Sequence, residues 1–237
     1  MEDGVGYLLY YNPDSANIVI RMALEELGAA YRDELVPRSR EERSEAFHRL
    51  NPRGLLPVLI EEDTDTAMFE TAAILAYLVE AHGRLGPPPG PTADRARFLK
   101  WLFFLSNTLH ADLRIRFYTR RFVGEDSEVP TVMSTLAKRI SAHLQLIDRE
   151  IGEHGGTTLL PGGLTVCDFY LGCCVRWAQL YPRDSALDGD LLARLPNLAA
   201  ALAALQDRPS VARAMHREDL PGPAFIAPEH ALPPRDG

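Results

Sequence analysis

Apolar and polar residues alternate in short segments over the first third of the chain. Short runs rich in aromatic and β-branched residues predict strands, and apolar residues spaced three or four apart predict helices. Strands are expected at 7–11, 31–36, 57–60 and 66–69, and helices at about 15–27 and 70–81, with a charged helix or loop at 40–50. This order favours one mixed sheet flanked by helices.

Beyond residue 93 the pattern is entirely helical. Apolar residues recur every three or four positions, which predicts helices at 94 to about 121, 130–152, 164–180, 195–206 and 209–215. The segment RLGPPPGPTA at 84–93 separates the two halves, because consecutive prolines end a helix and form a stiff spacer. We therefore expect an α/β domain at 1–83, a linker at 84–93 and an all-α domain at 94–219. A proline-rich tail at 220–237 should lie over the surface or be loose.

Composition narrows the possible partners and the compartment. The net charge of −8 disfavours nucleic acid and anionic membranes, which both need a basic face. No apolar run is long enough to span a bilayer, and the N-terminal segment does not resemble a signal peptide. The seven histidines lack the spacing of a zinc site, so no metal is expected. Three cysteines in one apolar helical stretch form no disulfide framework, which favours a cytoplasmic protein.

A proline opens the predicted strand at 57–60. If the bond between Leu56 and Pro57 is cis, the backbone of Leu56 faces outward and can pair with an extended peptide ligand. The ordinary alternative is a trans proline entering an edge strand.

Glu70 and Thr71 open the helix that follows the last strand. The free amides and partial positive charge of a helix N-terminus suit a carboxylate, and Glu70 would pair with an ammonium. Together they could hold an amino-acid head group. The ordinary alternative is an acidic N-cap.

These segments in combination resemble the cytosolic glutathione transferase family. The resemblance rests on NPRG at 51–54, LLPVL at 55–59 and FETAAILAYL at 69–78, and continues into the second half with LTVCDF at 164–169, a capping box. It implies a thioredoxin-like domain, an all-α domain and a homodimer. It also implies that Leu56 holds the cysteinyl backbone of glutathione, that Pro57 is cis, and that Glu70 and Thr71 hold the γ-glutamyl end.

The glycyl carboxylate of glutathione should meet a cation. Arg38 and Arg40 lie where the family often has a basic residue, and Arg53 is a third candidate. For each of the three, a solvated surface charge is an equal alternative.

The residues by which the beta class of this family acts on the glutathione thiol are absent from this sequence. The segment YYNPDSAN at 10–17 resembles the beta-class pattern, but Ala16 stands at the cysteine position and Asn17 at the following serine position. Chemistry through a protein cysteine is therefore excluded. Asn17 and Ser15 are the first candidate donors because they lie nearest the helix start, although Ser15 could simply cap the helix. For Tyr10 and Tyr11, packing is favoured over catalysis.

The helical half adds two candidates by resemblance. In the beta class the residue matching His110 faces the active site, and the residue matching Asn107 can touch glutathione across the dimer. The adjacent Cys173 and Cys174 are read as buried small apolar residues rather than a redox pair.

The expected function is conjugation of glutathione, as co-substrate, to a small hydrophobic electrophile. Glutathione-dependent reduction of disulfides or peroxides and a non-enzymatic ligand-binding homologue are the alternatives. The intact Glu70-Thr71 pair disfavours the last of these.

Overall fold

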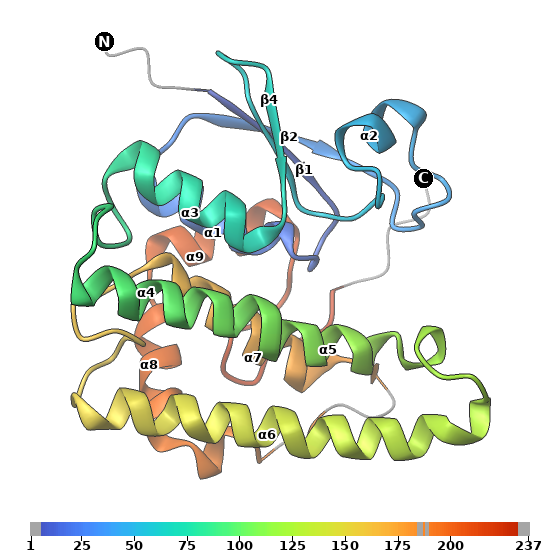
Figure 1. Cartoon of the computed structure of the whole chain (residues 1–237), viewed down its shortest axis with the longest axis vertical. Helices are drawn as coiled ribbons and strands as arrows, with labels where there is room; N and C mark the ends of the chain where they lie inside the picture. Colours follow the sequence, from blue (N-terminus) through green and yellow to red (C-terminus); the bar gives the residue numbers. More distant parts are fainter. Residues whose placement is uncertain (1–5, 184–186, 188–189, 232–237) are drawn as a thin grey trace. The chain divides into compact units, whose positions relative to one another are not determined.

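Contacts divide the chain into two compact units. The computed structural model describes residues 6–183, 187 and 190–231. Within that range the first unit comprises residues 6–88, 208–221 and 230–231, and the second comprises residues 89–207 and 222–229. Figure 1 shows the strands gathered in the first unit and the long helices in the second.

The first unit contains a four-stranded mixed sheet. Its strands are β1 (Tyr7–Tyr11), β2 (Tyr31–Leu35), β3 (Val58–Glu61) and β4 (Thr66–Phe69), in the order β2-β1-β3-β4. β1 runs parallel to β2, while β3 is antiparallel to both β1 and β4. The predicted sheet is confirmed, and its arrangement is thioredoxin-like.

Helices α1 (Asn17–Leu27), α2 (Glu45–Leu50) and α3 (Thr71–His82) belong to the same unit. All residues of α1 from Asn17 to Leu24 are buried, as expected of a central helix. α1 and α3 each end at a glycine in the left-handed region, Gly28 with φ 69° and Gly83 with φ 60°. Glycine adopts this conformation without a Cβ clash, so both helices stop where the chain must turn.

Helix α9 (Pro209–Arg217) also belongs to the first unit and packs on α1. Arg208 Nε lies 3.1 Å from Glu26 Oε2, and Arg213 Nε lies 2.7 Å from Glu25 Oε2. This grouping differs from the expected boundary at residue 219. The physical reason is that ion pairs between residues more than 180 positions apart leave no local pattern in the sequence.

Among its described residues, the second unit has helices as its regular elements, joined by turns and irregular segments. Its longest elements are α4 (Ala93–Phe104), α5 (His110–Phe117), α6 (Val129–Glu153), α7 (Val166–Leu180) and α8 (Pro196–Gln206); the short ones are η1 (Leu105–Leu109), η2 (Thr119–Arg121), η3 (Asp126–Glu128) and η5 (Leu192–Arg194). The single helix expected at 94–121 is interrupted by η1, a π-helical turn. A π-helical turn inserts one extra residue into the helix, so the side chains that follow it point in a different direction from those of an uninterrupted helix.

Helix α7 is almost entirely buried and starts with a capping box. Thr165 Oγ1 accepts a hydrogen bond from the Cys167 amide at 3.2 Å, and Asp168 accepts one from the Thr165 amide at 2.7 Å. Asp168 also accepts a hydrogen bond from the Leu159 amide at 2.7 Å, so it ties the preceding loop to the helix start. The capping box predicted from the sequence is thus confirmed.

The tail is held more firmly than expected. Phe225 is fully buried, and a side chain at Gly172 would collide with its ring. Arg176 donates to the carbonyl of Ala224 at 3.2 Å, and Gln179 donates to that of Phe225 at 2.9 Å. Residues 222–229 therefore pack into the helical unit instead of lying loosely over it, whereas 232–237 are outside the described residues.

The three cysteines are free and buried. Burial raises the pKa of the Cys167 and Cys174 thiols, which keeps both protonated and unreactive. The interpretation of Cys173 and Cys174 as buried apolar residues is confirmed. Within the described part of the chain, no helix has the length and apolar character needed to cross a membrane.

The capping box makes a testable contribution to stability. Thr165→Ala should lower the free energy of unfolding by about 1 kcal/mol, the usual cost of losing a cap. Asp168→Ala should cost more, because it leaves the Leu159 and Thr165 amides without an acceptor. Thr135→Ala is the control. The Thr135 side chain is exposed and its hydroxyl bonds to the Thr131 carbonyl in the same helix, so the free energy of unfolding should change by no more than about 0.5 kcal/mol. Urea unfolding measures all three; equal stabilities would contradict the assignment.

Candidate functional site

The segment before β3 presents an open backbone. The peptide bond between Leu56 and Pro57 is cis, as the resemblance implies. Among the described residues, neither the amide nor the carbonyl of Leu56 has a hydrogen-bond partner. The backbone of Leu56 can therefore pair with an extended ligand without displacing an internal bond.

Glu70 occupies an unusual backbone conformation immediately before α3. Its φ of 75° and ψ of 114° are costly for a residue with a Cβ, by about 1–3 kcal/mol, and such residues concentrate at ligand sites. Its side chain does not cap the helix, so the ordinary alternative for Glu70 does not apply. The exposed carboxylate lies 3.4 Å from Arg53 Nη1. Thr71 is buried at the first helical position, next to the free amides of the helix start.

The turn before α1 leaves one hydroxyl uncommitted. The Ser15 amide donates to the Asn12 carbonyl at 3.2 Å, and the Ser15 carbonyl accepts from the Ile18 amide at 3.0 Å. Ala16, not Ser15, is the N-cap residue. The half-buried Ser15 hydroxyl makes no hydrogen bond within the described residues. It is therefore available to a ligand beside the helix start.

Asn17 lies in the interior instead. Its side chain is fully buried, and Nδ2 donates to Glu218 Oε1 at 2.8 Å. Its Oδ1 accepts a hydrogen bond from the Asn12 amide at 3.2 Å. Both ends of the side chain are thus engaged in holding the turn. Because the Asn17 side chain is buried and already donates to Glu218, the exposed side of the turn favours Ser15 over Asn17 as the donor to the thiol.

Tyr10 and Tyr11 of β1 have packing roles. Tyr10 meets the ring of Phe47 edge-on at 5.4 Å and packs on a small cluster of Val36, Phe47 and Val58. Tyr11 lies under the guanidinium of Arg21, 4.6 Å from ring centroid to Cζ. Burial raises the pKa of both phenols, so neither is poised as a phenolate at neutral pH.

Basic side chains connect the separate segments of this site. Arg38 Nη2 donates to the Pro13 carbonyl at 2.6 Å, which fastens the loop after β2 to the turn before α1. Arg43 donates to the carbonyls of Pro37 and Gly54, and thereby joins that loop to the segment leading to Leu56. Arg43 was not among the residues expected from the sequence, and nothing in its local pattern distinguishes it from Arg38.

The carbonyl of Arg40 contacts the His48 ring nitrogen Nε2 at 3.2 Å. Arg38 and Arg53 are exposed and Arg40 is half-buried. The first unit thus links the turn at 12–15, Arg38, the Gly54–Leu56 segment, Arg53 and Glu70 through a continuous series of contacts.

His110 and Asn107 lie in the helical unit. His110 opens α5 directly after the π-helical turn; its Nδ1 lies 2.8 Å from the Tyr170 hydroxyl and its ring lies 5.0 Å from that of Trp177. Burial, aided by Arg114, lowers the pKa of His110 to about 4, so the ring is neutral at pH 7. Asn107 is exposed on η1, where its Oδ1 accepts from Ser106 at 3.0 Å.

Comparison with known proteins gives a consistent result. Residues 9–89 match the family described as "Glutathione S-transferase, N-terminal domain". The chain is 27% identical over 218 residues to "Glutathione S-transferase GstA" of Escherichia coli O157:H7, which covers 90% of this chain and 98% of the relative. A glutathione transferase structure from Methylococcus capsulatus str. bath superposes with a TM-score of 0.75 at 27% identity, covering 90% of this chain and 98% of that one.

A sphingomonad glutathione S-transferase complexed with glutathione superposes with a TM-score of 0.75 at 25% identity, over 90% of this chain and 100% of that one. Residues 9–89 therefore belong to the glutathione S-transferase N-terminal domain family, and the similarity to glutathione transferases extends over about 90% of the chain. The candidate residues before α1, before β3 and at the start of α3 lie within this matched segment, whereas Asn107, His110 and Glu218 lie beyond it.

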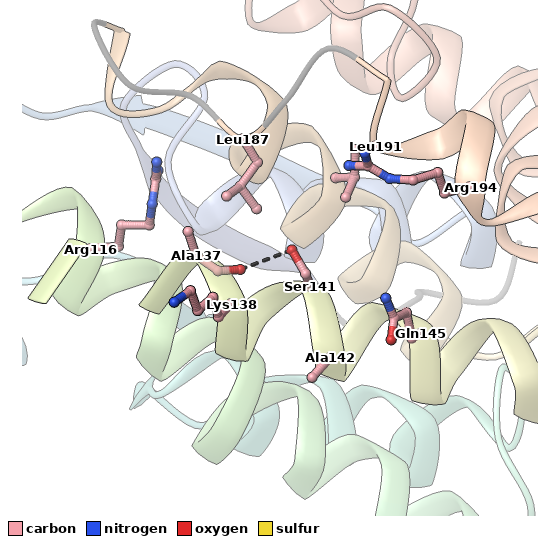
Figure 2. A pocket seen from close by; sticks show the side chains of 9 residues that line it. All are labelled: Arg116, Ala137, Lys138, Ser141, Ala142, Gln145, Leu187, Leu191 and Arg194. Carbon is pink, nitrogen blue, oxygen red and sulfur yellow. Dashed lines mark hydrogen bonds between the residues drawn. The ribbon is translucent and has the colours of Figure 1, made fainter. Parts of the chain in front are cut away.

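The helical unit also contains a pocket, shown in Figure 2. Its volume is about 470 Å³. It lies along α6 and is lined by Arg116, Ala137, Lys138, Ser141, Ala142, Gln145, Leu187, Leu191 and Arg194. None of the residues that the sequence predicts for glutathione binding lines it.

The exposed carboxylate of Glu70 provides a direct test of the site. Glu70→Ala should weaken glutathione binding at least tenfold, because a hydrogen bond to a charged group is worth about 1.5–3 kcal/mol. Glu62→Ala is the matched control, since Glu62 forms a similar exposed ion pair with Arg32 away from α3. Isothermal calorimetry with glutathione compares the two. Unchanged affinity in Glu70→Ala would refute the assignment.

Proposed function

We propose that the protein is a glutathione transferase whose bound glutathione thiolate attacks a small hydrophobic electrophile, a detoxification reaction. One observation carries this proposal: three groups suited to glutathione occur together in the first unit. They are the open backbone at Leu56, the exposed Glu70 carboxylate before α3, and the Ser15 hydroxyl before α1, which makes no internal hydrogen bond within the described residues. The name of the GstA relative and the glutathione bound to the sphingomonad relative support it.

In this proposal each part of glutathione has a partner. The backbone of Leu56, next to Pro57, pairs with the cysteinyl residue. Glu70 receives the γ-glutamyl ammonium, and Thr71 with the adjacent helix amides receives its carboxylate. One of Arg38, Arg40 and Arg53 meets the glycyl carboxylate.

Arg53 already contacts Glu70, so an incoming ammonium would compete for that carboxylate. Because this ion pair is largely exposed, its loss costs little.

The helical unit supplies the remaining contacts in a homodimer. Asn107 touches glutathione from the second subunit, and its exposure on η1 is compatible with that role. His110 contributes a neutral ring, so it acts by hydrogen bonding or packing and brings no positive charge to the electrophile side.

Activation of the thiol needs more than the helix alone. Lowering a thiol pKa from about 8.5 to below 7 requires about 2.7 kcal/mol. A helix N-terminus supplies about 0.3–1 kcal/mol, and a hydrogen bond to a charged acceptor about 1.5–3 kcal/mol. The Ser15 hydroxyl beside the start of α1 can provide that hydrogen bond. The thiolate then forms the carbon–sulfur bond while the leaving group departs from the electrophile.

The three free thiols favour the cytoplasm as the working compartment, because a reducing environment keeps unpaired cysteines reduced.

A substrate panel tests the reaction. Aryl halides should be conjugated at rates well above the uncatalysed reaction, whereas hydroxyethyl disulfide and cumene hydroperoxide should be reduced slowly or not at all. The disappearance of the aryl halide measures conjugation, and the formation of oxidised glutathione measures reduction. Reduction without conjugation would contradict the proposal and indicate a glutathione-dependent reductase. Inactivity towards all three substrates would contradict it too and indicate a protein that only binds its ligand.

Ser15→Ala tests whether Ser15 is the residue that lowers the pKa of the glutathione thiol. Loss of the hydroxyl should raise the pKa of bound glutathione by about one unit or more, since the lost hydrogen bond is worth about 1.5–3 kcal/mol. Ultraviolet titration of the thiolate measures the shift. Ser39→Ala is the control, because the Ser39 hydroxyl bonds to Glu41 in an exposed loop. If the titration of Ser15→Ala matches that of the unmodified protein, a backbone amide or a tyrosine is the donor.

A further inference from the structure

A carboxylate from the far end of the sequence reaches the turn that carries Ser15. Glu218 follows α9 directly, and its side chain is fully buried. Figure 1 shows α9 beside α1 in the first unit. Glu218 Oε2 accepts a hydrogen bond from the Asp14 amide at 2.9 Å, and Oε1 accepts from Asn17 Nδ2 at 2.8 Å and from Arg21 Nε at 2.9 Å.

These bonds fix the turn on both sides of Ser15. Asp14 has a φ of 56°, which is unfavourable for a residue other than glycine, so its conformation must be held by its surroundings. Glu218 holds its amide directly. On the other side Glu218 orients Asn17, whose Oδ1 accepts from the Asn12 amide at 3.2 Å. Ser15 is therefore positioned between two points that the same carboxylate anchors.

The charge of this carboxylate is balanced within the first unit. Arg21, itself fully buried, bridges Glu218 and Asp33 and also approaches the Tyr31 hydroxyl at 3.4 Å. Burial raises the pKa of Glu218 to about 7, and Arg21 opposes the rise. A buried carboxylate of this kind is costly unless it is fully paired and hydrogen-bonded. Packing α9 on α1 does not require it, because Glu25 and Glu26 already join the two helices by ion pairs with Arg213 and Arg208.

We propose that Glu218 is a positioning residue that holds the 12–17 turn so that the Ser15 hydroxyl and the start of α1 face the thiol of bound glutathione. It acts through the Asp14 amide and the Asn17 side chain, and does not itself touch glutathione. The inference rests on the proposed function. It adds a contribution from the C-terminal segment to activation of the thiol.

Glu218→Gln separates positioning from glutathione binding. The glutamine oxygen can still accept from Asn17 and Arg21, but its amino group would face the Asp14 amide, and two donors cannot bond to each other. The turn should loosen while the contacts at Leu56 and Glu70 stay intact. We expect kcat to fall about tenfold, the pKa of bound glutathione to rise by about one unit, and the KM for glutathione to change less than twofold.

Glu26→Gln is the matched control, because Glu26 joins α1 to α9 without contacting the turn. It should change neither kcat nor the thiol titration. A folded Glu218→Gln variant with unaltered kcat and thiol pKa would overturn the proposal, as would equal effects of the two substitutions.

A measurement on the unmodified protein covers the case in which Glu218→Gln does not fold. Hydrogen exchange of the Asp14 amide should be at least a hundredfold slower than in an unstructured peptide, because that amide is bonded to a buried acceptor. Fast exchange would overturn the proposal. If calorimetry shows no glutathione binding by the unmodified protein, the proposed function fails, while Asp14 exchange still decides whether Glu218 holds the turn.

Discussion

The buried ion pair between Arg21 and Glu218 is the interaction on which the first unit and its candidate glutathione site most depend. Both side chains are fully buried, and the pair joins the first helix of the chain to the end of the last one. Removing one partner of such a pair costs about 3–5 kcal/mol, a large share of the 5–15 kcal/mol by which a typical protein is stable. The same carboxylate binds the turn before α1, so the stability of the first unit and the geometry of its helix start are set together.

The groups proposed for binding and the groups proposed for activation lie in separate segments of the first unit. The groups expected to grip glutathione, Leu56 and Glu70, belong to the loop before β3 and the start of α3. The backbone of Leu56 has no partner within the described residues, and the Glu70 carboxylate makes only an exposed ion pair with Arg53. The turn before α1 is the opposite case, since most of its polar groups are committed. Such a rigid frame with one uncommitted hydroxyl suits the proposed role of Ser15, because a preorganised donor costs no reorganisation when the thiolate forms.

The strands and helices could be predicted closely because their patterns are local. Strands β1 and β4 match the expected ranges, and α7 starts at the capping box that its sequence displays. The expected helix at 94–121 differs at the π-helical turn, where apolar spacing alone does not reveal one extra residue in the repeat, and at its C-terminal end, where α5 ends at Phe117 and η2 follows. The tail was misjudged because proline content indicates irregular backbone but not the cavity beside Gly172 that Phe225 fills.

The sequence by itself determined the fold class and the family resemblance. It also supplied Leu56, Pro57, Glu70 and Thr71 as candidate site residues, since each depends on a short motif whose parts are neighbours in the chain. Only the tertiary structure decided that Asn17 faces Glu218 in the interior, that Ser15 keeps a free hydroxyl, and that α9 joins the first unit. The physical reason is that a side chain's hydrogen-bond partner is set by which segments meet in space. Asn17 and Glu218 are 201 residues apart, and no local pattern records their contact.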